Sequence, residues 1–266
     1  MPCAFTRAVS PRIAECELTH LERTPIDPRA ADAQHATYEQ ALAGAGFGVI
    51  RLPDLPDHPD AVFVEDTALL LGDHAIILRP GAASRAGETP STAAGLAAHF
   101  ELHRLENGYV DGGDVLTIGD TIHVGRSTRT DAAGIADLRR IVAPFGYRVI
   151  EAALRDCLHL KSGATFLGPD ANGTPVLLFS PRSVDPAQFA GGEPIAVDAA
   201  EAAAANCLRV GDRLIIPADH PRTAERLRQR GFAVVEVDVS ELQKAEAGVT
   251  CMSLIDERGS MTPALT

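Results

Sequence analysis

The ten residues Val115–Val124 read VLTIGDTIHV, an apolar strand, a Gly119-Asp120 turn and a second apolar strand. Glycine and aspartate supply the positive φ angles that a tight hairpin turn requires. The stretch therefore predicts a β-hairpin, and the same pattern of residues recurs on both sides of it along the chain.

Three further hairpins of this kind accompany the central one. They run through 67–78, 164–179 and 207–216, and the middle one of these has a longer loop. The turn glycines are separated by 47, 49 and 43 residues, in the order Gly72, Gly119, Gly168 and Gly211. A period in the mid-forties indicates a repeated structural unit. The segment 253–257 begins a fifth unit, whose other parts are expected at the N-terminus.

Helix and strand signals lie between the hairpins. Asp27 is a preferred N-cap and Pro28 a preferred first helical residue, so a helix is expected through residue 43. Further helices are expected over 90–100, 130–145 and 220–230, and strands over 47–52, 102–105, 147–150 and 232–239. About five units, each with a hairpin, a helix and a further strand, can pack round one axis. The sequence thus predicts an α/β fold, a five-bladed α/β propeller, with 1–266 as a single domain.

Composition restricts the function. The 266 residues are 45% hydrophobic, which is enough for a full core, and the net charge is −12. A negative chain disfavours a nucleic-acid partner and mildly favours a cationic or zwitterionic small molecule. No apolar run approaches the length that spans a bilayer, so neither a membrane partner nor a secretory leader is expected. Five scattered cysteines predict reduced thiols and a cytoplasmic protein.

Polar residues occur at the same place in successive units, shortly before each turn. They are Glu65 and Asp66, Asp111 and Asp114, His159 and Ser162, Asn206, and Cys251. In a ring of repeats, equivalent positions converge on one end of the axis. A thiol, an imidazole and several carboxylates would then meet in one pocket, although each alone is more often a structural residue.

The same residues resemble a known enzyme family. The chain reads DAVFVED over 60–66, RPGAASR over 79–85, VDGGDV over 110–115, HLKS over 159–162, ANC over 205–207 and VTC over 249–251. In this order, over nearly the whole chain, these runs resemble the dimethylarginine dimethylaminohydrolases of the guanidine-modifying pentein superfamily. The resemblance implies the fivefold propeller and a cofactor-free hydrolysis of Nω-methylated arginine to citrulline and a methylamine.

The resemblance also implies catalytic roles. Cys251 matches the nucleophile, His159 the general acid and base, and Asp111 the acidic residue that orients the histidine. These residue types suit the reaction, because a delocalised guanidinium carbon is a poor electrophile and requires a nucleophile as strong as a thiolate. A cationic substrate beside the thiol would itself favour the thiolate, so the resting pKa of Cys251 need not be low.

Substrate-binding residues follow by the same matches. Asp66, with Asp60 and Glu65 nearby, resembles the family's acidic cluster that faces the guanidinium group. Arg85 and Arg129 match the arginines that hold the substrate carboxylate. The segment 16–27 resembles the family's lid, in which Leu18 would offer its backbone to the substrate amine. Ser162, in the run HLKS, completes the expected binding set with Glu246.

Two departures from the family pattern are visible. The family carries Asp-Gly shortly before the nucleophile, whereas this chain has Glu246-Ala247-Gly248, so a side chain expected to face the substrate amine is one methylene longer. The tail 257–266 extends past the fifth unit and, with little apolar character, is expected to be frayed.

Other interpretations remain open at this point. Arginine deiminases and amidinotransferases share the Cys-His-carboxylate set, and a propeller could also bind arginine-like ligands without turnover. A zinc enzyme is a third interpretation, but the spacing of His159 and Cys251 is no metal motif. No metal is expected to serve the reaction, and bound zinc would inhibit by occupying the thiol. A homodimer is compatible with the sequence.

Overall fold

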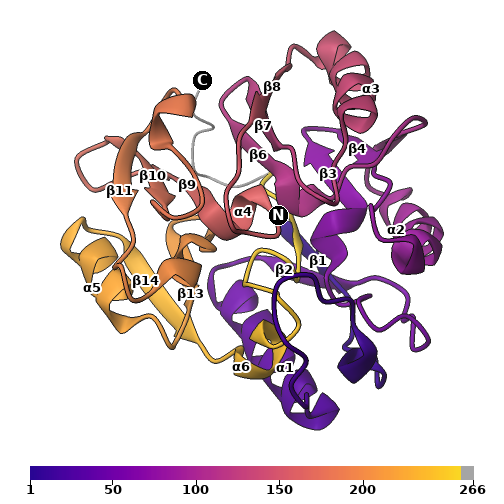
Figure 1. Cartoon of the computed structure of the whole chain (residues 1–266), viewed down its shortest axis with the longest axis horizontal. Helices are drawn as coiled ribbons and strands as arrows, with labels where there is room; N and C mark the ends of the chain where they lie inside the picture. Colours follow the sequence, from indigo (N-terminus) through magenta and orange to yellow (C-terminus); the bar gives the residue numbers. More distant parts are fainter. Residues whose placement is uncertain (259–266) are drawn as a thin grey trace.

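The computed structural model describes residues 1–258 and forms five three-stranded sheets over that range (Figure 1). In each sheet the central strand pairs antiparallel with one neighbour and parallel with the other. The units follow one another round the molecule in chain order, as Figure 1 shows. The separate sheets and their common strand order confirm the predicted fivefold α/β repeat.

Three of the hairpin units each carry an α-helix in the crossover before their last strand. The second unit holds β3 (Ala68–Leu71), β4 (His74–Ile77) and β5 (Glu101–Arg104), with α2 (Thr89–Leu96) before β5. The third holds β6 (Val115–Ile118), β7 (Thr121–Gly125) and β8 (Arg148–Ala152), with α3 (Ala132–Val142). The last of the three holds β12 (Leu208–Val210), β13 (Arg213–Pro217) and β14 (Ala233–Val237), with α5 (Pro221–Gln229). These helices end earlier than the sequence predicted for 90–100 and 130–145.

The fourth unit departs from the expected pattern. It holds β9 (Ala164–Pro169), β10 (Pro175–Phe179) and β11 (Glu193–Ala196), but its crossover contains only the 3₁₀ turn η6 (Pro186–Gln188) within the described chain. The connecting segment carries Pro181, Pro186 and the pair Gly191-Gly192. Proline lacks a donor and glycine costs backbone entropy, so these residues disfavour an α-helix there.

The first unit is assembled from both ends of the chain. It joins β1 (Cys3–Thr6), β2 (Gly48–Arg51) and β15 (Leu254–Asp256), with α1 (Pro28–Gly44) as the crossover. Asp27 caps α1 by accepting from the N–H groups of Arg29 and Ala30, as the sequence predicted. Phe5 pairs with Leu254 across the antiparallel β1–β15 ladder, which confirms that the N-terminal strand completes the unit that begins with 253–257.

Part of the predicted frayed tail is packed. Arg258 donates to Asp256 at 2.9 Å and to Asp73 at 2.7 Å, and its guanidinium lies over the ring of Phe100. These contacts fix the chain up to residue 258, because the ion pairs and the aromatic ring hold one side chain from three directions. The remainder of the expected frayed tail, 259–266, lies outside the described residues.

Short turns precede the first strand of each sheet and meet at the centre. They are η2 (Val64–Thr67), η4 (Gly112–Asp114), α4 (Leu160–Gly163) and η7 (Ala202–Ala205), and the turn 248–251 that follows α6 (Ser240–Gln243). Neighbouring turns contact each other, η2 with η4, η4 with α4, and α4 with η7. The polar positions of the repeat lie in or next to these turns, so the ring brings them together as the sequence predicted.

Five hydrogen bonds link these turns in sequence, and we call them the inner belt. Gly113 N donates to Asp66 Oδ1 and Leu160 N to Asp114 Oδ1, both at 2.9 Å. Asn206 Nδ2 donates to Lys161 O at 3.2 Å, and Thr250 N donates to Asn206 Oδ1 at 3.0 Å. Glu65 N closes the circuit by donating to Cys251 O at 3.1 Å. Each bond joins adjacent units, so the belt fixes the relative positions of all five turns.

The belt should be measurable in unfolding. Asn206→Ala removes bonds to two neighbouring turns and leaves the Thr250 N–H and the Lys161 carbonyl without their partner. We expect the free energy of unfolding to fall by about 1–3 kcal/mol, since each unpaired buried group costs energy of this order. Urea denaturation would measure the change, with the exposed Asn172→Ala as the matched control. Equal stability of the two variants would contradict a structural role for the belt.

Candidate active site

Cys251 lies in the turn directly before β15, at the inner end of the first unit. Its Sγ accepts from Gly248 N at 3.4 Å, and its carbonyl belongs to the inner belt. Burial, together with the carboxylates of Glu65 and Asp66, raises the pKa of the Cys251 thiol to about 12. The resting group is therefore a thiol held rigidly by its backbone, and a nearby positive charge is needed to convert it to a thiolate.

His159 precedes α4 and pairs with a carboxylate of the neighbouring unit. Its Nε2 lies 3.0 Å from Asp111 Oδ2, while Asp111 Oδ1 accepts from Gly81 N at 2.7 Å. Burial opposes a charge on the ring, but the carboxylates of Asp66, Asp111 and Asp114 outweigh it and raise the pKa of His159 to about 9. At neutral pH the ring is an imidazolium, oriented by Asp111, with Nδ1 outside the Asp111 contact.

Gly113 makes room for this histidine. A Cβ at this position would lie 2.6 Å from His159 Nδ1 and 3.0 Å from Asp66 Oδ1. Real Cβ atoms do not approach other heavy atoms this closely, so a larger residue would displace the imidazole or the carboxylate. The glycine-rich run before β6, which by itself reads as a turn, is thus required by close packing of two charged side chains.

One small cavity collects most of the expected site residues. Its volume is about 30 Å³, and it is lined by Glu17, Asp60, Phe63, Asp66, Arg85, Asp111, Arg129, Leu158, His159, Ala245, Glu246, Ala247 and Cys251. Carboxylates predominate in this wall, which suits a ligand with a cationic end. A cavity of this size holds a water molecule and not an amino acid, because small-molecule sites measure about 300–1,000 Å³.

The segment 16–27, which the sequence predicts to be a lid and which is called the lid below, contacts the wall of the cavity. Backbone N–H groups of Thr19, His20 and Leu21 all donate to the carboxylate of Glu246. Glu17 N donates to both oxygens of Asp60 at 3.2 Å, on the opposite side of the cavity. Burial raises the pKa of Asp60 to about 6. The carboxylates of Asp60 and Glu246 therefore hold the lid in place by accepting hydrogen bonds from its backbone N–H groups.

Glu246 adopts an unusual backbone conformation for this task. Its φ is +59°, in the left-handed region that residues with a Cβ rarely occupy. Strained residues of this kind cluster at sites where a side chain must be aimed. The expectation that Glu246 reads a substrate amine is untested, and in this closed form lid N–H groups occupy its carboxylate instead.

The two predicted arginines have different surroundings. Arg85 is buried and donates to Asp66 Oδ2 at 2.5 Å, to both oxygens of Glu88, and to the carbonyls of Asp60 and Phe63. Arg129 is half-buried, and its Nη2 donates to the lid hydroxyl of Thr19 at 2.9 Å. Most donors of Arg85 are therefore already used, whereas Arg129 is held by one hydroxyl that moves with the lid.

Three predicted binding residues lie outside the cavity lining. The carboxylate of Glu65 accepts from Lys161 Nζ at 2.5 Å and from Thr250 Oγ1 at 2.9 Å. These three residues line another cavity, which contains none of the lid residues. Ser162 and Cys157 line a neighbouring cavity of about 390 Å³, which shares Leu158, Glu246 and Ala247 with the cavity of Cys251. Leu18 is half-buried against the core cluster beneath the lid.

Sequence reasoning missed other contributors. Glu17 was not singled out within the lid, although its N–H reaches Asp60 and its carboxylate accepts from Ser84 Oγ at 2.6 Å. Asp114 was noted only as a polar repeat position, yet it anchors Leu160 N beside the histidine and has a pKa raised by burial to about 6. The repeat was the available signal, because Asp66 and Asp114 both lie within two residues of the start of the first strand of their units, β3 and β6.

Three side chains of the site are of the type that can bind a metal ion. Oxygen and nitrogen atoms of Asp66, Asp111 and His159 lie within 4.8 Å of one another, so they could approach one ion. All three residues already have other partners, since Asp66 accepts from Gly113 N and Arg85, and Asp111 pairs with His159. Over residues 1–258, no helix has the length and apolar character needed to cross a bilayer.

The chain is similar in sequence to proteins of known name. No protein-family model matches it. It is 41% identical over 253 residues to the N(G),N(G)-dimethylarginine dimethylaminohydrolase of Streptomyces coelicolor, covering 94% of this chain and 95% of that protein. It is 38% identical over 224 residues to the Pseudomonas aeruginosa protein of the same name, covering 83% and 86% of the two chains.

Solved structures agree with these relatives. A cysteine-to-serine variant of the Pseudomonas aeruginosa enzyme, in complex with citrulline, matches with a TM-score of 0.88 and 34% identity over 95% of this chain and 98% of that one. The N-terminal domain of a cyanobacterial arginine dihydrolase matches with a TM-score of 0.81 but 21% identity, and so shares the fold. With such identity over nearly the full length of two named relatives, the chain belongs to the dimethylarginine dimethylaminohydrolase family.

Proposed function

We propose that the protein hydrolyses Nω-methylated arginine to citrulline and a methylamine through a covalent adduct on Cys251. The observation that carries this proposal is the meeting of Cys251, the His159–Asp111 pair and Asp66 on one acid-rich cavity beneath a lid. The names of the relatives and the citrulline bound to one of them support the same reaction.

The first half-reaction uses the two raised pKa values. A guanidinium cation entering the cavity lowers the pKa of the Cys251 thiol, which otherwise stays protonated, so the thiol gives its proton to water and the thiolate forms only beside its target. Sγ then bonds to the guanidinium carbon. His159, an imidazolium in the resting site, donates its proton to the methylated nitrogen as that C–N bond breaks.

The second half-reaction reuses the same histidine. After losing its proton His159 is a neutral base, still held by Asp111, and it takes a proton from the water that adds to the thiouronium carbon. The C–S bond then breaks, citrulline is released, and the remaining proton of the added hydroxyl passes to the sulfur, which restores the resting thiol. Closure of the lid excludes other bases, so both proton transfers depend on one imidazole.

Recognition requires both charged ends of the substrate. Asp66 faces the cavity beside His159 and suits the planar guanidinium. Arg129 suits the substrate carboxylate, because moving the lid frees its only described side-chain partner, Thr19. Arg85 acts mainly by fixing Asp66 through their ion pair at 2.5 Å. Asp60, Leu18 and Glu246 would meet the substrate's amine end after the lid rearranges.

The chain is proposed to act as one catalytic domain without a cofactor. Cys251 lies in the turn that leads into β15, and β15 pairs with β1. The N-terminal strand therefore belongs to the same unit as Cys251. Zinc, if it binds among Cys251, His159 and the nearby carboxylates, should compete with the substrate and inhibit. A homodimer is compatible with the sequence and is not part of the proposal.

The reaction is tested by its product. We expect citrulline from monomethylarginine and asymmetric dimethylarginine, and loss of this product in Cys251→Ser, because an alkoxide does not replace the thiolate at this carbon. Cys157→Ser is the matched control and should retain turnover, because Cys157 is not among the residues that line the cavity of Cys251. Citrulline formed faster from unmethylated arginine would favour the deiminase interpretation, and turnover surviving in Cys251→Ser would overturn the mechanism.

The state of the thiol can be read from alkylation. Because the pKa of Cys251 is raised to about 12, its alkylation by neutral iodoacetamide should keep rising with pH through pH 10, about tenfold per unit. A cationic haloacetamidine should react already at neutral pH, since its charge favours the thiolate. Glu65→Gln removes one cause of the shift and should move the neutral reagent's profile to lower pH. A profile that levels off near pH 8.5 would contradict this picture.

The lid contacts predict a change in protease sensitivity. Arg23 donates to the carbonyls of Ala14 and Cys16 at 2.6 Å. Trypsin must bind this side chain to cleave after it, so cleavage requires that the lid opens and these bonds break. Glu246→Gln replaces an acceptor oxygen by an N–H donor that faces the lid N–H groups. We expect several-fold faster cleavage after Arg23, measured by mass spectrometry, with Glu236→Gln on β14 as control. An unchanged rate would show that Glu246 does not hold the lid.

A further inference from the structure

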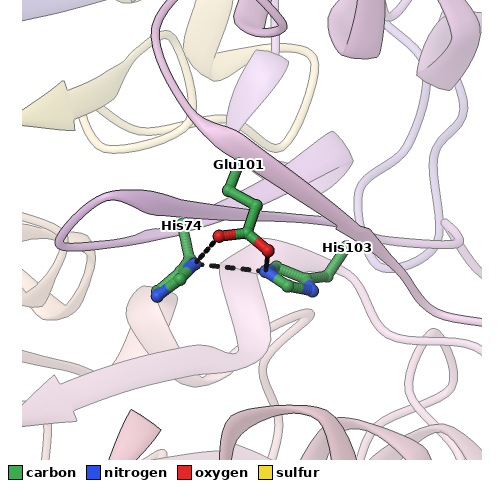
Figure 2. Close-up of side chains that lie close together, drawn as sticks. All are labelled: His74, Glu101 and His103. Carbon is green, nitrogen blue, oxygen red and sulfur yellow. Dashed lines mark hydrogen bonds and ion pairs between the residues drawn. The ribbon is translucent and has the colours of Figure 1, made fainter.

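A second cluster of ligand-type side chains lies on the second unit. His74 begins β4, and Glu101 and His103 lie on β5, the parallel neighbour of β4. His74 is paired with Glu101 in the register, and His103 follows two residues later on the same face of the strand. Figure 2 shows both rings and the carboxylate directed at one point between them.

The distances in this cluster match those of ligands on one ion. His74 Nδ1 lies 3.2 Å from His103 Nε2, and the Glu101 oxygens lie 3.5 Å from the first nitrogen and 3.8 Å from the second. Two atoms bound to a tetrahedral zinc at about 2.0–2.1 Å are themselves about 3.3 Å apart. A small inward shift of the carboxylate would therefore place all three groups at bonding distance.

The two rings are held in place by packing. His74 stacks on Phe145 with ring centroids 3.9 Å apart and an interplanar angle of 13°, and the centroid of His103 lies 4.9 Å from the same ring. Phe145 follows α3, so the cluster lies where the second unit meets the third. Glu101 N donates to Asp73 O, which fixes the backbone beside the hairpin turn. The nitrogen ligands are thus arranged before any ion arrives.

The cluster is separate from the catalytic cavity. None of His74, Glu101 and His103 is among the residues that line that cavity. The histidine side chains are about one quarter exposed and the Glu101 side chain is 69% exposed, so an ion has direct access from solvent. Water can complete the coordination from the open side.

We propose that His74, Glu101 and His103 form a binding site for a divalent transition metal ion of the zinc type. Two imidazoles and one carboxylate suit zinc and its neighbours in the first transition row better than magnesium or calcium, which prefer oxygen ligands. The ion would connect β4 to β5 across the crossover that contains α2. It would stabilise the folded chain, because the unfolded chain does not hold these ligands together.

The experiment uses the full chain carrying Cys251→Ser, which removes the competing thiol, and Zn²⁺ as the probe. Calorimetric titration should show a site that His103→Ala and Glu101→Gln each weaken more than about tenfold, since even outer partners of a metal site change affinity by 10–100-fold. Zn²⁺ should also raise the melting temperature of this protein but not that of the His103→Ala variant. His99→Ala, an exposed histidine two residues before Glu101, is the matched control and should bind as the parent does.

A zinc soak of crystals locates the ion directly. Anomalous density between His74 Nδ1, His103 Nε2 and the Glu101 carboxylate would establish the site. Density confined to Asp66, Asp111 and His159 would overturn it, as would a Zn²⁺ affinity that His103→Ala and Glu101→Gln leave unchanged. Because neither readout uses catalysis, the outcome is independent of the proposed hydrolysis.

Discussion

The inner belt is the constraint on which the site depends, because each of its bonds connects one repeat to the next. Asp66 shows the coupling most directly. Its Oδ1 accepts from Gly113 N in the next unit, and its Oδ2 accepts from Arg85, while its charge raises the pKa of both Cys251 and His159. One carboxylate thus joins two units and sets the charge of both catalytic groups, so ring geometry and site chemistry are not separable.

The acid-rich site has a consequence for selectivity. The raised pKa values leave Cys251 as a thiol and His159 as an imidazolium. A thiol does not attack a neutral compound, whereas an imidazolium can protonate a departing amine. In the proposed mechanism, only a ligand that brings its own positive charge converts the thiol to the nucleophile. Selection for cations is therefore exercised at the moment of activation as well as in binding.

Much of this could be predicted from the sequence, and what could not has a common cause. The spacing of the Gly-Asp turns predicts the fivefold repeat, and resemblance places Asp111 beside His159, where the structure has it at 3.0 Å. The repeat did not predict that Glu246 accepts lid N–H groups or that Glu65 turns to Lys161, because these partners are remote in sequence and set by packing. The fourth unit lacks an α-helix in its described crossover for a local reason, its prolines and glycines, which the averaged repeat concealed.

The first sheet, built from β1, β2 and β15, has a consequence for biosynthesis. Synthesis proceeds from the N-terminus, so β1 and β2 leave the ribosome long before β15, which pairs with β1. The nucleophile turn directly precedes that last strand. The position of Cys251 in the ring is therefore completed only when β15 docks on β1. Assembly order thus delays chemistry until the ring is whole.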